Sequence, residues 1–164
     1  MTNTDIQRLC QLFNDTEQLL EQYNAIAEVI MKTESDELEL LAEKIDERQK
    51  LIDKISELRI EATKILDGGD KQEAELIRGM LKGENAIQRI PDELIPVRKA
   101  VVNLRSAHIK AAESDRSLQL QFESRLQEAK DQLKQLNSDK KKLDYYSSLN
   151  QTGANLGGSL DGSF

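Results

Sequence analysis

Residues 94–122 carry an unbroken heptad repeat, in which steps of three and four residues alternate. Such spacing places all members on one face of an α-helix, where another helix can cover them. Only His108 and Asp115 interrupt the apolar character of this face. The members are Leu94, Val97, Val101, Leu104, His108, Ala111, Asp115, Leu118 and Phe122. We therefore expect a long helix whose apolar stripe continues to Tyr146.

The composition favours helices in the rest of the chain as well. Of the 164 residues, 38% are hydrophobic, 32% are charged and only 4% are aromatic, with no Trp and two Pro. Strands draw on runs of β-branched and aromatic residues, which are missing here. We predict an all-α fold: an elongated antiparallel helical bundle or coiled coil of three main helices with a flexible C-terminal tail.

Two helices are expected in the first part of a single coiled-coil domain that spans residues 1–146. The first covers about residues 4–32, because Thr4 can cap it while Gln7 reaches back in a capping-box spacing. The second covers about residues 35–66, with Ser35 as its N-cap. Two successive glycines at positions 68 and 69 end this second helix.

The later part of the chain divides into a short helix, a long helix and a tail. Residues 71–90 are weakly helical, and the long helix is expected over residues 92–146, starting between two prolines. Residues 147–164 hold four of the eight glycines and one charged side chain, so helix propensity falls there. This tail is either solvated or a short motif that orders on a partner.

No catalytic, metal or cofactor site is expected. The one histidine and the one cysteine, His108 and Cys10, lie far apart in the sequence, and no nucleophile, phosphate-loop or metal-ligand motif occurs. A structural role on the helical seam is the expectation for His108, and a place in the core for Cys10.

The charge and hydropathy of the chain indicate which cellular location and which partners to expect. No apolar run approaches the length of a membrane span, and the first residues lack the features of a secretory signal, so we expect a cytoplasmic protein without stable membrane insertion. The formal net charge of −7 disfavours nucleic acid as a partner. Lys140, Lys141 and Lys142 form the one basic run, which we interpret as a solvated helix face.

The end of the long helix has more apolar surface than the first two helices can cover. The residues concerned are Leu133, Leu136, Leu143 and Tyr146. Two interpretations remain open: a groove for an amphipathic helix of a partner, or homodimerisation through the same strip. The adjacent Tyr145 and Tyr146 suit a protein interface, with the alternative that Tyr146 closes the core.

The chain resembles flagellar type III export chaperones of the FlgN class over about residues 5–150. The features that carry the resemblance are a first helix rich in Glu and Leu, the segment ELELLAEKIDERQKLIDKISELR, a Gly-containing break, and a long last helix that ends in aromatic residues. The resemblance implies a non-enzymatic cytoplasmic chaperone without a cofactor. Its partners would be hook-associated flagellar proteins and the flagellar export gate.

Site residues follow from the same resemblance. It implies that Tyr145 or Tyr146 contacts the export gate, and that the late apolar positions Leu126, Leu133, Leu136 and Leu143 bind the client protein. The competing expectation, from a different functional class, is a dimeric coiled-coil adaptor or scaffold. Stoichiometry separates the two: a chaperone forms discrete complexes with helical clients, whereas a scaffold stays a stable oligomer.

Overall fold

The computed structural model describes residues 1–34, 36–84 and 90–156, with side chains described as far as Ser147. Within these residues the chain forms helices and no β-strand, so the predicted all-α class is confirmed. The elements, in order, are α1 (Asn3–Lys32), α2 (Leu38–Gly68), α3 (Lys71–Lys82), the 3-10 turn η1 (Asp92–Leu94) and α4 (Ile95–Leu156).

Contacts within the chain define two compact units, Met1–Gln119 and Leu120–Phe164. The sequence had predicted one domain over residues 1–146, so the division falls earlier than expected. The reason lies in burial along α4: among the described side chains of this helix, Leu118 is the last that is buried. Beyond it, the described side chains are partly or largely exposed.

α1 begins at Asn3, one residue earlier than expected, and Thr4 is not its cap. Thr2 is the N-cap residue: its hydroxyl accepts a hydrogen bond from the Asp5 backbone N–H at 3.2 Å, and Asp5 accepts one from the Thr2 backbone N–H at 2.9 Å. This reciprocal pair is a capping box, and a carboxylate also suits the positive end of the helix dipole. A capping box with the predicted three-residue spacing is present, but it joins Thr2 to Asp5 and not Thr4 to Gln7.

α2 begins at Leu38, so the predicted start at residue 35 was three residues too early. Glu37 is the N-cap residue and makes no side-chain capping hydrogen bond. Ser35, the predicted cap, lies outside the described residues. At the other end, α2 continues through Gly68, and Asp70 then caps α3 by accepting hydrogen bonds from the backbone N–H groups of Gln72 and Glu73.

α3 ends at Lys82, so the prediction of a helical segment to residue 90 was wrong. Gly83 follows with a φ of 85°, a left-handed conformation that suits glycine, and its N–H satisfies carbonyl groups of the last turn. Residues 85–89 lie outside the described part. Short as it is, α3 is well anchored, because Ala74, Ile77 and Met80 are buried.

α4 differs from its prediction at both ends. Residues 92–94 form η1, so the α-helix itself starts at Ile95; Pro96 lies in its first turn, where a missing N–H costs little. At the other end, the helix continues to Leu156, past the predicted boundary at residue 146. The first ten residues of the predicted tail are therefore helical, and residues 157–164 lie outside the described part.

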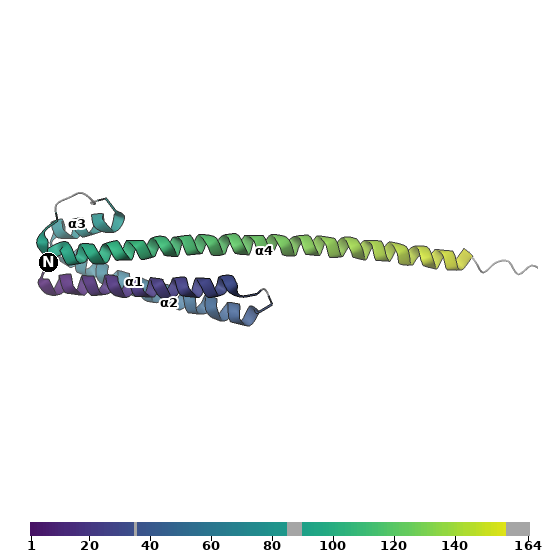
Figure 1. The fold of residues 1–164 in the computed structure, drawn as a ribbon, viewed down its shortest axis with the longest axis horizontal. Coiled ribbons are helices and arrows are strands. Elements are labelled where there is room, and N and C mark those ends of the chain that lie inside the picture. Colours follow the sequence, from purple (N-terminus) through teal and green to yellow (C-terminus); the bar gives the residue numbers. More distant parts are fainter. Residues whose placement is uncertain (35, 85–89, 157–164) are drawn as a thin grey trace, which may run out of the picture. The chain divides into compact units, whose positions relative to one another are not determined.

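Residues 1–119 form a helical bundle around one main core (Figure 1). α2 runs antiparallel to α1, as the pairs Arg8–Glu61 and Tyr23–Arg48 show. α4 runs parallel to α1 here, because Tyr23 contacts Asp115 and Ile30 packs in a cluster with Leu118. The largest fully buried side chains are Leu9, Leu12, Ile30, Ile77, Leu94, Val97 and Val101.

Cys10 fits the expectation of a core-side residue. The thiol is half-buried beside the main core. Burial raises its pKa above the ordinary value, since the thiolate is the charged form. A raised pKa disfavours the reactive thiolate at neutral pH.

Candidate functional site

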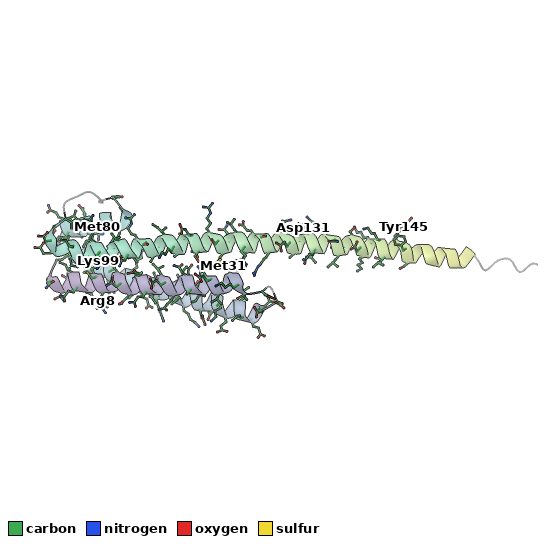
Figure 2. The ribbon with its side chains drawn as sticks, viewed as in Figure 1. Arg8, Met31, Met80, Lys99, Asp131 and Tyr145 are labelled. Atoms are coloured by element: carbon green, nitrogen blue, oxygen red, sulfur yellow. The ribbon has the colours of Figure 1, made fainter. Side chains whose placement is uncertain are left out.

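The apolar positions predicted for client binding form an exposed row on α4. Leu126, Leu133, Leu136 and Leu143 expose 57%, 61%, 65% and 67% of their surface, and we call these four residues the leucine stripe. At 100° per residue they fall within about 100° of the helix circumference, which is one face. Asp131 and Tyr145, labelled in Figure 2, mark the segment of α4 that carries the stripe.

Local polar pairs support the helix that bears the leucine stripe. Lys134 lies 3.3 Å from Asp131 and Lys142 lies 3.4 Å from Asp139, each at the spacing of one helical turn. Gln127 also donates a hydrogen bond to Asp131. Pairs of this kind stabilise a helix by about 0.2–0.5 kcal/mol each. The polar side chains of this segment therefore pair with one another within the helix, while the leucines of the apolar face remain exposed.

Tyr145 and Tyr146 are both exposed, at 62% and 63%. Their rings meet edge to face, with centroids 6.0 Å apart and planes inclined by 67°. The interpretation in which Tyr146 closes the core was therefore wrong. The two rings present an aromatic, hydroxyl-bearing surface directly after Leu143, and such side chains are enriched in protein interfaces.

A polar cluster that the sequence only hinted at joins three helices of residues 1–119. The Tyr23 hydroxyl of α1 donates to the two carboxylate oxygens of Asp115 of α4, at 3.0 and 3.2 Å. The Arg48 guanidinium of α2 donates to the same carboxylate and stacks 3.7 Å from the centroid of the Tyr23 ring. The heptad spacing marks Asp115 as a polar residue in the seam, but no local pattern identifies Tyr23 and Arg48 as its partners.

The electrostatics of this cluster favour a neutral Tyr23. Burial, followed by the hydrogen bond to Asp115, raises the pKa of Tyr23. The side chain of Arg48 is only 14% exposed, whereas that of Asp115 is 50% exposed. The charge of Arg48 is therefore the one that depends most on its ion pair. We assign the cluster a structural role, which is to fix the register of the three helices, and no catalytic role.

Replacing Asp115 by alanine is expected to lower the free energy of unfolding by about 2 kcal/mol, because it leaves a nearly buried guanidinium without its carboxylate. Urea denaturation followed by far-ultraviolet circular dichroism measures this change. The matched control is Asp131→Ala, which removes an exposed carboxylate of the same helix and should cost less than about 0.5 kcal/mol. Equal losses in the two variants would show that the cluster does not tie the helices together.

His108 lies on α4 at a position that remains exposed. Its pKa is lowered, first by partial loss of water around the ring and then by the positive charge of Arg59. A lowered pKa keeps the imidazole neutral at pH 7. The described residues contain no group of three His, Cys, Asp or Glu side chains that could hold a metal ion.

Comparisons of the chain with protein-family models, curated proteins and solved structures returned no match. None of the described helices contains an apolar stretch that could cross a membrane. Of the predicted site residues, the structure brings Leu126, Leu133, Leu136 and Leu143 onto one exposed face, with the two tyrosines directly after it.

Proposed function

We propose that this chain is a non-enzymatic chaperone that binds amphipathic helical segments of other proteins on the leucine stripe. The observation that carries the proposal is the high exposure of four leucines at heptad spacing on one helix face. Contiguous apolar surface of this kind marks interaction sites in soluble proteins. A partner helix would cover it with its own apolar face, as in other helix-in-groove complexes.

The energetics suit a reversible complex. Full burial of a leucine side chain contributes about 1.5–3 kcal/mol, so four leucines supply up to roughly 6–12 kcal/mol before costs. Association itself costs an estimated 4–15 kcal/mol in lost translational and rotational freedom. Because the two quantities are similar, such a stripe binds well enough to shield a client helix and weakly enough to release it.

The specific clients we propose are hook-associated flagellar subunits, which the chaperone would hold in the cytoplasm and deliver to the type III export gate. This part rests on the resemblance to chaperones of the FlgN class. Tyr145 and Tyr146 are the proposed gate contact, because both rings are exposed and follow the stripe directly. An exposed aromatic pair offers a docking point that a bound client does not need to cover.

The alternative is a dimeric coiled-coil adaptor, which the heptad spacing of the stripe also favours. The charges beside the stripe argue against self-pairing. A parallel in-register dimer would set Arg125 against Lys130 and Asp139 against Asp144 of the second copy. An antiparallel dimer that pairs Leu126 with Leu143 would set Glu123 against Asp144. Like charges at these flanking positions destabilise both arrangements, so a partner of different sequence fits better.

The test is to mix the full chain with hook-associated subunits encoded in the same genome. Size-exclusion chromatography with light scattering should give a discrete complex with one chaperone chain, and amide hydrogen exchange should slow at residues 122–143. The free chain should be monomeric. A stable homodimer that ignores the subunits would overturn the chaperone and establish the adaptor.

A further inference from the structure

A cavity of about 410 Å³ lies within residues 1–119, among side chains from all four α-helices. Its floor is apolar and includes Phe13, Ala62, Leu66 and Leu104, all of them buried. A volume of this size is within the range of small-molecule sites in proteins, about 300–1,000 Å³. The cavity belongs to a different unit from the leucine stripe, so the proposed chaperone function does not use it.

The charged side chains that line the cavity are cationic. They are Arg59, Arg78 and Arg105; the neutral His108 lines it as well, and the described lining contains no Asp or Glu, although the chain holds 30 acidic residues. Arg78 forms an ion pair with Asp67, a residue outside this lining. None of the ion pairs among the described residues involves Arg59 or Arg105, so no described carboxylate neutralises these two charges.

Two further observations locate these guanidinium groups. Arg59 and His108 both line the cavity, and the charge of Arg59 lowers the pKa of His108. The guanidinium of Arg105 lies against Gly83, so closely that a Cβ at that position would overlap it. Arg105 therefore reaches from α4 to the end of α3 across the cavity wall.

Other polar side chains of the lining are occupied by their own helices. The hydroxyls of Thr16, Ser56 and Thr63 each donate to the carbonyl oxygen four residues earlier, at 2.7, 2.9 and 2.8 Å. The protons of these three hydroxyls are therefore already bonded to backbone carbonyls and are not donated to an anion. The cavity thus combines an apolar floor with guanidinium donors, which bind carboxylate and phosphate groups in a forked geometry.

We propose that this cavity binds a small amphipathic anion, with an apolar chain on the floor and a single anionic head group at Arg59 and Arg105. The apolar floor explains the preference for a ligand with a hydrocarbon chain, because binding removes the apolar surfaces of both the floor and the ligand from water. The absence of lining carboxylates explains the preference for a negative head, in a protein whose net charge would otherwise repel anions.

The experiment uses three ten-carbon probes that share a chain and differ in head group: decanoate, decanol and decyltrimethylammonium. Each is titrated into the ¹⁵N-labelled full chain, and binding is followed through the amide resonances of Ala62 and Leu104. Decanoate should bind at least about tenfold more tightly than decanol, and decyltrimethylammonium should bind most weakly. Equal affinities, or shifts confined to residues 122–143, would overturn the proposal.

Decyl phosphate in place of decanoate then identifies the head group. A stronger response to the phosphate assigns the site to phosphorylated amphiphiles, and a stronger response to decanoate assigns it to carboxylates. Both outcomes support an anion site. Failure of both anions to exceed decanol contradicts it.

Variants test the two arginines separately from the fold. Arg59→Gln, at an exposed position of α2, should weaken decanoate binding about tenfold and leave decanol binding unchanged, and Arg105→Gln should act in the same way. The matched control is Arg116→Gln on α4, which does not line the cavity and should change neither affinity. If Arg105→Gln fails to fold, Arg59→Gln alone decides, because its side chain lies at the surface. Unchanged decanoate binding in Arg59→Gln would overturn the assignment.

Discussion

Replacing Leu133 and Leu136 together by aspartate is expected to abolish client binding, with a loss of affinity of at least about 100-fold. Two charges placed in the middle of the leucine stripe would have to lose their water when a client helix docks, and burying an unpaired carboxylate is costly. The measurement is isothermal titration of the variant with a hook-associated subunit, compared with the unaltered chain.

The same double variant should leave the unfolding of residues 1–119 unchanged, because both leucines lie outside that unit and are largely exposed. The matched control is Leu120→Asp. Leu120 is an exposed leucine of the same helix, at 59%, but it lies on the opposite side of the helix by the rotation of 100° per residue. Full client affinity in the double variant, or an equal loss in the control, would show that the stripe is not the binding face.

Replacing Leu9 by alanine is expected to have the largest effect on stability. Leu9 is fully buried in the main core, and deleting a buried leucine to alanine costs about 2–5 kcal/mol through lost burial and the cavity that remains. Chemical denaturation should show a loss of about 3 kcal/mol.

The control for this prediction is the same substitution in an exposed leucine. Leu136→Ala removes identical atoms from α4 but should change the free energy of unfolding by less than about 0.5 kcal/mol, because the side chain is already in water. Comparable losses at the two positions would mean that the leucine stripe is covered in solution. That result would favour the dimeric adaptor over the chaperone.

The heptad repeat predicted the buried face of α4 well. Val97, Val101, Leu104 and Leu118 of α4 are buried, as is Leu94 in the preceding η1, whereas Phe122 at the end of the repeat is 39% exposed. The alternation of three and four breaks after Phe122, where the apolar residues continue as the leucine stripe. Spacing alone does not say whether such a face is covered. Burial depends on which other helices reach it, and this is a property of the tertiary structure.

The helix ends and the cavity show where sequence reasoning failed. Thr2 and Thr4 offer nearly the same capping pattern two residues apart, and only the better match with Asp5 decides between them. The arginines of the cavity come from three different helices, at positions 59, 78 and 105. No local pattern connects residues so far apart in the sequence, so their convergence appears only when the helices pack.

Gly83 affects both the backbone at the end of α3 and the packing of a side chain from α4. Its left-handed backbone ends α3, and its missing side chain makes room for Arg105. Genetic variation at this position therefore changes helix termination and the charge around the cavity at the same time. By contrast, Gly68 has open space around it. In a library of variants selected for function, glycine should be retained at position 83, whereas other residues should be accepted at position 68.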